Sequence, residues 1–338
     1  MKKSLIIGGV ALIVVVLAIV LWAQEPAAPT IIEEVGTNTE SGDGTLPSSG
    51  GQMLEPKSGG EVFVPAPVDA RGRAIFAITD APTNLGLVKS VFITIQKIEV
   101  QGPKKGWVVV STAPKTFDVL ELKRSGSFGV LADVSLEAEE YNQLRFSVSG
   151  VQVVHNDGAV SVAKLPSGVI RVTGLAPVQA NKTSSAVIDF DLERSLILTA
   201  EGRYLFAPVV KLLTRTSVVA ELTQGNKVRF SSGSTQNQYS VGMDENGSVK
   251  ENFMLDPLSR FELLGETLKI VPQGMNEDGV IISAEKAIDI ARTAGGLPTA
   301  LSVKLVLSGN AKAWQVSGMK NGALSSVVVH AETGAILP

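Results

Sequence analysis

Acidic residues at alternate positions are the strongest chemical signal in the sequence. Asp189 and Asp191 alternate in the run VIDFDL, so in a strand both would project from one face while the apolar residues around them face the core. Asp80 ends an earlier predicted strand and is expected to approach them. Carboxylate oxygens suit Ca²⁺, although a complete site needs about six to eight oxygen ligands. Asp80, Asp189 and Asp191 are therefore the candidate calcium ligands; alternatively, they solvate the outer face or cap turns.

The sequence contains few residues or motifs that indicate catalysis. The chain has no cysteine, and its two histidines, His155 and His330, fall in different predicted domains. The nucleophile elbow, the P-loop and the zinc motif H-E-x-x-H do not occur. Two carboxylates on one strand face cannot bracket a sugar as a glycosidase pair does. We therefore predict a non-enzymatic protein with no catalytic residues and no cofactor other than the possible calcium ion.

Aromatic residues also argue against a stacking site for carbohydrates. The sequence holds three tryptophans and three tyrosines, which offer few platforms. Trp22 ends a hydrophobic run, and Trp107 and Trp314 lie in strand patterns that predict core positions.

Composition favours a mainly β protein. Hydrophobic residues make up 44% of the 338 positions but aromatic residues only 5%, so the core must consist mainly of Val, Leu, Ile and Ala. The net charge of -3 gives no general attraction to nucleic acid, and no nucleic-acid partner is expected.

The N-terminus predicts a membrane anchor. Residues 1–4 carry two lysines, and the apolar run over 5–22 would span about 27 Å as a helix, close to the bilayer core. Because no Lys or Arg follows until Lys57, residues 1–4 should be cytoplasmic and the bulk of the chain extracytoplasmic. The alternative is secretion after signal cleavage. Residues 23–66, rich in Pro, Gly, Ser and Thr, predict a disordered linker.

Residues 67–216 predict an antiparallel β-sandwich. Polar and apolar residues alternate in short runs separated by turn residues, and Asn156-Asp157-Gly158 indicates a hairpin. The expected strands cover Ala74–Ile78, Val91–Val100, Trp107–Val110, Thr116–Leu122, Gln143–Val148, Val151–Val154, Val160–Leu165, Gly168–Val172, Ala186–Leu192 and Tyr204–Leu213.

Several of these runs carry a family resemblance. The order FAITDAP, VKSVFITIQKIEV, WVVVS, FDVLEL, YNQLRFSVSGVQVV, KLPSG, VIDFDLERSL and YLFAPVVKL resembles the DUF4382 domain over about residues 72–215. The resemblance implies a β-sandwich module of cell-envelope proteins and no particular activity.

Residues 273–338 predict a small α+β domain, one helix on a three-stranded antiparallel sheet. Ser283 can cap a helix whose apolar residues recur at helical spacing, and three strand-like runs follow it. ISAEKAIDIA, AWQV and VVVHAETGAIL resemble the PepSY domain over about 280–337, although His330 stands where that family commonly has Asp. Residues 217–272 are either a β linker or an extension of the sandwich.

Together these features predict a membrane-anchored binding or scaffold protein of the cell envelope, with a protein or peptide partner and an oligomeric state that the sequence leaves open. The PepSY resemblance gives the alternative, a regulator or inhibitor of an envelope protease.

Overall fold

The computed structural model describes residues 70–80 and 85–338. The predicted cytoplasmic tip at 1–4, membrane helix at 5–22 and linker at 23–66 lie outside these ranges. Within them, no helix is both long enough and apolar enough to cross a bilayer.

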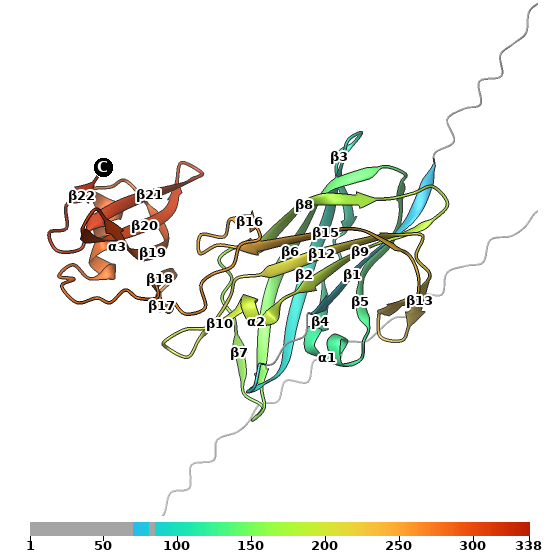
Figure 1. Cartoon of the computed structure of the whole chain (residues 1–338), viewed down its shortest axis with the longest axis horizontal. Helices are drawn as coiled ribbons and strands as arrows, with labels where there is room; N and C mark the ends of the chain where they lie inside the picture. Colours follow the sequence, from blue (N-terminus) through green and yellow to red (C-terminus); the bar gives the residue numbers. More distant parts are fainter. Residues whose placement is uncertain (1–69, 81–84) are drawn as a thin grey trace, which may run out of the picture. The chain divides into compact units, whose positions relative to one another are not determined.

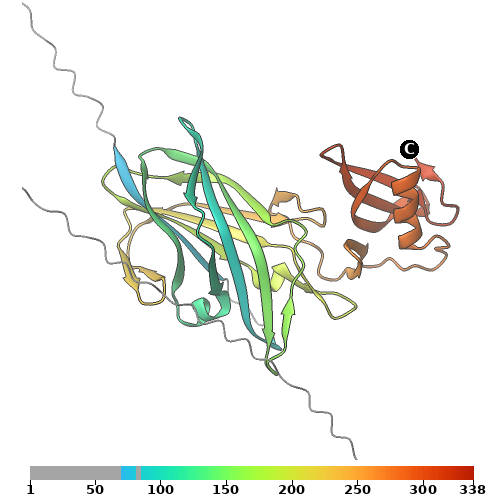
Figure 2. The same cartoon turned by 180° about the vertical axis from the view of Figure 1, so that it is seen from behind.

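Two sheets form the sandwich in the described part of the chain (Figures 1 and 2). The first sheet has the order β13 (Ala220–Thr223), β14 (Lys227–Phe230), β5 (Phe128–Glu137), β1 (Arg71–Asp80), β9 (Thr183–Phe190), β12 (Val209–Thr216), β15 (Ser234–Met243) and β16 (Val249–Glu251). The second sheet contains β3 (Gly106–Ser111), β2 (Val88–Gly102), β6 (Glu140–His155) and β7 (Val160–Val162), with β4 (Lys115–Asp118) paired to β2 and β8 (Val169–Pro177) to β6.

Apolar residues from both sheets form one core between them. Period-two alternation sends Phe76 and Ile78 of β1 and Ile93 and Ile95 of β2 into the same cluster. Phe146 of β6 meets Phe190 of β9 edge to face, with ring centroids 6.1 Å apart, so the two sheets are in direct contact. This packing confirms a mainly β protein.

The first sheet is mixed, so the prediction of a wholly antiparallel sandwich was wrong. β1 and β9 pair in parallel, with Ile75 opposite Ser185. Parallel neighbours need a long connection, and here the chain passes through the strands of the second sheet between β1 and β9.

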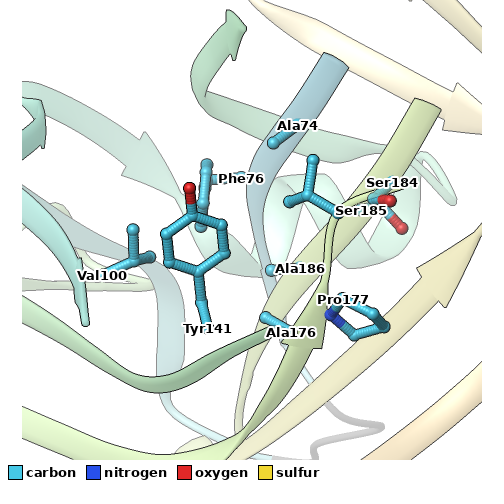
Figure 3. A pocket seen from close by; sticks show the side chains of 10 residues that line it. Ala74, Phe76, Val100, Tyr141, Ala176, Pro177, Ser184, Ser185 and Ala186 are labelled. Carbon is cyan, nitrogen blue, oxygen red and sulfur yellow. The ribbon is translucent and has the colours of Figure 1, made fainter. Parts of the chain in front are cut away.

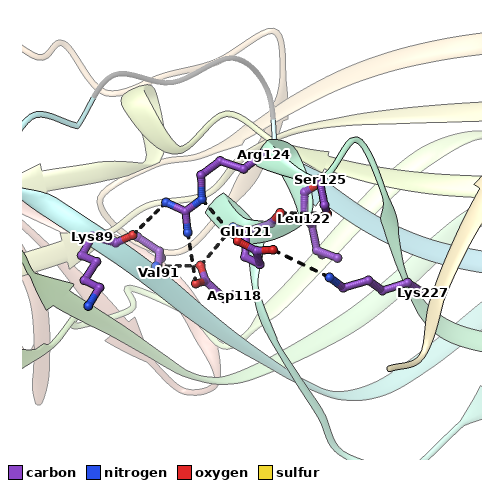
Figure 4. Close-up of polar contacts among 8 residues, drawn as sticks. All are labelled: Lys89, Val91, Asp118, Glu121, Leu122, Arg124, Ser125 and Lys227. Carbon is purple, nitrogen blue, oxygen red and sulfur yellow. Dashed lines mark hydrogen bonds and ion pairs between the residues drawn. The ribbon is translucent and has the colours of Figure 1, made fainter. Parts of the chain in front are cut away.

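The predicted strand over Thr116–Leu122 is half helix. The helix α1 (Val119–Arg124) begins there because Asp118 Oδ1 accepts from Glu121 N at 3.3 Å, which caps the first turn. Figure 4 shows α1 and its surroundings; Arg124, the last residue of the helix, forms ion pairs with Glu121 and with the capping Asp118. The capping aspartate therefore overrides the strand pattern.

Three further predicted strands have different limits. The run Tyr204–Leu213 divides into β11 (Tyr204–Phe206) and β12, because Pro208 has no N–H to donate to a ladder. β11 pairs with β10 (Leu196–Leu198), which follows the short helix α2 (Leu192–Ser195). Gln143–Val148 and Val151–Val154 instead belong to one strand, β6, which is bulged where it pairs with β2.

Residues 217–272 divide between two sheets. β13 to β16 extend the first sandwich sheet, which is one of the two alternatives that the sequence left open. β17 (Arg260–Leu264) and β18 (Thr267–Val271) instead join a second six-stranded sheet with β19 (Thr299–Ser308), β20 (Ala311–Lys320), β21 (Ala323–His330) and β22 (Ile336–Leu337). The prediction of a three-stranded sheet for the C-terminal region was therefore wrong. The expected strands form the centre of this six-stranded sheet, and β18 pairs in parallel with β19.

The C-terminal helix α3 (Ala284–Thr293) has the predicted cap and apolar face. Ser283 accepts from Lys286 N, and Ala287 and Ile288 pack in one cluster with the strand residue Val303. Trp314 is fully buried there, and its indole N–H donates to Ile282 O at 2.7 Å. The core position predicted for this tryptophan is confirmed.

A close backbone approach yields a stability test. A side chain at Gly242 of β15 would place its Cβ 1.8 Å from Phe253 O, whereas Gly150 of β6 has open space. Gly242→Ala should lower the free energy of unfolding by about 1–3 kcal/mol, because a main-chain neighbour must move. Gly150→Ala should leave it unchanged or slightly raised. Equal losses in urea denaturation would contradict the packing described here.

Candidate functional site

The predicted calcium ligands do not share one face. In the parallel register of β1 and β9, Asp80 lies opposite Phe190 and Thr79 opposite Asp189. Paired residues of neighbouring strands point to the same face, so Asp80 is on the core side with Phe190, and Asp189 is on the outer side. Within the described residues, no group of three His, Cys, Asp or Glu side chains is placed to hold a metal ion.

Asp80 and Asp191 serve local structure around α2. Asp80 Oδ1 accepts from Leu192 N at 3.2 Å, and Asp191 Oδ1 accepts from Arg194 N at 3.2 Å, which caps the helix. Asp80 also lines a cavity of about 220 Å³ that contains Lys123 and Arg124. Those two cations oppose a divalent cation at this carboxylate.

Asp189 is the least satisfied of the three carboxylates. Burial raises its pKa, nearby Lys211 and Lys123 lower it, and Asp191 raises it again, with burial the largest effect. Its Oδ1 is buried without a hydrogen-bond partner. When folding raises the pKa of an acid, the folded state loses stability as the pH rises above the ordinary pKa of that acid. The negative charge of Asp189 therefore destabilises the fold at neutral pH.

Asp189→Asn should therefore raise the free energy of unfolding at pH 7, by about 1 kcal/mol, because a neutral side chain removes the buried charge. The gain should vanish near pH 3, where the aspartate is itself neutral. Thermal unfolding with and without Ca²⁺ gives the measurement. A calcium-dependent stabilisation of the wild type that Asp189→Asn abolishes would instead restore the calcium site.

The two histidines make separate local contacts. His155 Nε2 lies 3.1 Å from Ser161 Oγ across the β6–β7 hairpin, and its ring packs 5.6 Å from that of Tyr204. In the described residues no carboxylate hydrogen-bonds to His155, so the Ser–His contact lacks the third member of a triad. His330 Nδ1 accepts from two backbone N–H groups in the turn before β22.

A cavity between the two sheets is too small for an organic ligand. It measures about 10 Å³, close to the space of one water molecule. Figure 3 shows Tyr141 beside Val100 and Phe76, with Ser184 and Ser185 on the neighbouring strand. Both serine hydroxyls are buried without partners, and burial raises the pKa of Tyr141 to about 12.

The outer face of the second sheet carries a different constellation, which we call the Trp107 face: Lys97, Glu99, Trp107, Arg145 and Arg171. Trp107 is only partly buried, so its predicted core position was wrong. The guanidinium carbon of Arg145 lies 4.2 Å from the centre of the indole ring, and that of Arg171 lies 5.6 Å from it. Both distances are within the range of cation–π attraction.

Strand register assembles this face from four strands. Glu99 of β2 lies opposite Arg145 of β6, which in turn lies opposite Arg171 of β8. One row further along, Trp107 of β3 lies opposite Gln101 of β2.

Glu99 holds the network together. Its side chain is only 8% exposed; Oε1 accepts from Lys97 Nζ at 2.8 Å, and Oε2 accepts from Arg145 Nε and pairs with Nη2, both at 2.7 Å. The hydrogen bond from Lys97 and the contacts of Arg145 outweigh burial and hold the pKa of Glu99 below its ordinary value. Arg145 is thereby fixed over the indole, while Arg171 is exposed.

The sequence contained a signal for this face. In QKIEVQG the polar residues Lys97, Glu99 and Gln101 alternate with Ile98 and Val100, which predicts a solvated outer side. Closing the GPKKG turn as a hairpin then places Trp107 opposite Gln101, on that same side.

Part of the chain matches a known family. Residues 71–208 match the family model described as Domain of unknown function (DUF4382). The predicted resemblance is confirmed for this part of the chain, which includes the whole Trp107 face. No curated protein and no solved structure matches the chain. The PepSY resemblance of the C-terminal region stays a prediction.

The central carboxylate of the face can be tested by its pH dependence. Glu99→Gln should lower the free energy of unfolding at pH 7 by about 1–2 kcal/mol, because two cations lose their charged partner. Since folding lowers the pKa of Glu99, the difference from wild type should shrink as the pH falls below the ordinary glutamate value of 4.5. The exposed Glu193→Gln is the matched control and should have no measurable effect. A difference that does not change with pH would contradict the ion-pair network.

Proposed function

We propose that this chain is a non-catalytic binding protein of the cell envelope and that the Trp107 face is its binding surface. The observation that carries this proposal is the indole of Trp107 in cation–π contact with two guanidinium groups, those of Arg145 and Arg171, on a sheet face turned away from the core. Tryptophan and arginine are the residues that most often dominate binding energy at interfaces. A carboxylate that is 8% exposed fixes Arg145, so this part of the face is ordered before a ligand arrives.

The location is part of the same proposal. Residues 5–22 form an anchor with the short N-terminal tip in the cytoplasm, and residues 23–66 act as a spacer that presents the sandwich outside. The two lysines before the hydrophobic run and the absence of Lys and Arg between that run and Lys57 support this orientation. Cleavage of the N-terminal segment would release the same domains by secretion.

A second candidate function concerns the C-terminal sheet, through its PepSY resemblance. β22 pairs only with Val328 and Val329 of β21. Residues 323–327 pair with β20 on one side, and in the described part of the chain their other side is an edge without a strand partner. An extended peptide could add to such an edge through main-chain hydrogen bonds. This edge favours regulation of an envelope protease as the alternative.

Capture of envelope material separates the two candidates. The full chain in nonionic detergent is immobilised and exposed to envelope fractions of the cells that produce it. Under the leading proposal, Arg171→Gln should reduce specific capture about five- to tenfold, because one exposed guanidinium is worth roughly 1 kcal/mol or more. The control Arg229→Gln, also an exposed strand arginine but on the other sheet, should leave capture unchanged.

The alternative predicts the reverse pattern. Leu324→Lys with Ser326→Lys places charges on the β21 edge, where they oppose strand addition. Loss of capture, or altered proteolysis in the envelope, with this double variant but not with Arg171→Gln would favour the protease regulator. Equal capture by all variants would contradict both proposals.

A further inference from the structure

We propose that the ligand of the Trp107 face is an acidic polysaccharide whose carboxylates pair with Arg171 and Arg145. This inference rests on the proposed function and adds the class of ligand to it. It starts from the charge of the face, which differs in sign from that of the chain.

Positive charge on the face exceeds negative charge. The face carries three cations, Lys97, Arg145 and Arg171, and one carboxylate, Glu99, which pairs with Lys97 and Arg145. The whole chain, in contrast, has a net charge of -3. The adjoining β2–β3 hairpin adds Lys104 and Lys105, of which Lys105 pairs with Glu137. A local positive patch on an acidic protein attracts anions to that patch rather than to the surface in general.

Arg171 is the group best placed to take a carboxylate. It is exposed, and among the described residues its guanidinium forms no ion pair and lies against the indole of Trp107. Its guanidinium therefore keeps its N–H donors available, in a planar arrangement that fits both oxygens of a carboxylate. Contact with the indole limits the positions that the guanidinium can adopt, which reduces the entropy lost on binding.

The row of residues next to Arg145 and Arg171 offers hydrogen-bond partners for hydroxyl groups. Gln143 lies opposite both Gln101 and Thr173, so two amides and a hydroxyl stand side by side across β2, β6 and β8. Amide and hydroxyl side chains both donate and accept hydrogen bonds, as sugar hydroxyls do. A cationic row beside an amide row matches a polymer that carries carboxylates and hydroxyls together.

An acidic peptide fits this surface less well. An extended peptide binds to sheets mainly by adding to an edge, where unpaired main-chain groups are available. β2 and β6 are instead paired with strands on both sides, so the centre of this face offers side chains alone. The observations therefore favour a polysaccharide.

The test measures binding of the full chain, in nonionic detergent, to polygalacturonate by titration calorimetry. Methyl-esterified polygalacturonate is the matched neutral polymer, and polyglutamate is the acidic peptide. We expect polygalacturonate to bind, the esterified polymer to bind at least tenfold more weakly, and raised ionic strength to weaken binding. Arg171→Gln should weaken binding five- to tenfold, while Arg229→Gln should not change it.

Three results would overturn the inference. Equal weakening by Arg171→Gln and Arg229→Gln would show general charge attraction without a site. Tighter binding of polyglutamate, dependent on Arg171, would make an acidic peptide the ligand. Absence of polygalacturonate binding, with envelope capture still dependent on Arg171, would refute the polysaccharide but leave the proposed binding function intact.

Discussion

Burial of one face of β2 and β6 is the constraint on which the rest of the structure depends. Ile93, Ile95 and Ile98 of β2 and Phe146 of β6 are almost completely buried between the sheets. Because successive side chains alternate, sealing this face forces the residues between them to the other side. The hydrophobic core thereby determines which side chains the protein presents to its surroundings.

The side chains of the Trp107 face differ in burial and in what they contribute to the fold. Glu99 is nearly buried and holds Arg145 in place, so it contributes to stability and positioning, whereas Arg171 contributes little to the fold and remains accessible. Such a division between a fixed support and an exposed contact is what a preorganised binding surface requires. The predicted calcium ligands lack a comparable arrangement, since Asp80 and Asp189 lie on opposite faces of their sheet.

Local patterns predicted much of the fold. Alternation identified the sandwich strands, and the cap at Ser283 with its apolar spacing identified α3. Features that depend on distant segments could not be predicted: the parallel pairing of β1 with β9, and the addition of the β17–β18 hairpin to the C-terminal sheet. Asp118 could have revealed α1, because a capping residue followed by Glu121 is a local signal.

The candidate site was missed for a more specific reason. The aromatic residue Trp107 was assigned to the core from its apolar neighbours, but side-chain direction depends on register with β2 rather than on the run itself. The partners Arg145 and Arg171 lie on strands far along the chain, so only pairing across β6 and β8 brings them to the indole.

NMR of the indole N–H signals during titration with polygalacturonate measures whether an acidic polysaccharide contacts the Trp107 face. The signal of Trp107 should shift, while that of Trp314, which is fully buried and hydrogen-bonded to Ile282, should stay in place. A titration that shifts the Trp314 signal and leaves the Trp107 signal unchanged would show that the polysaccharide does not bind at the Trp107 face.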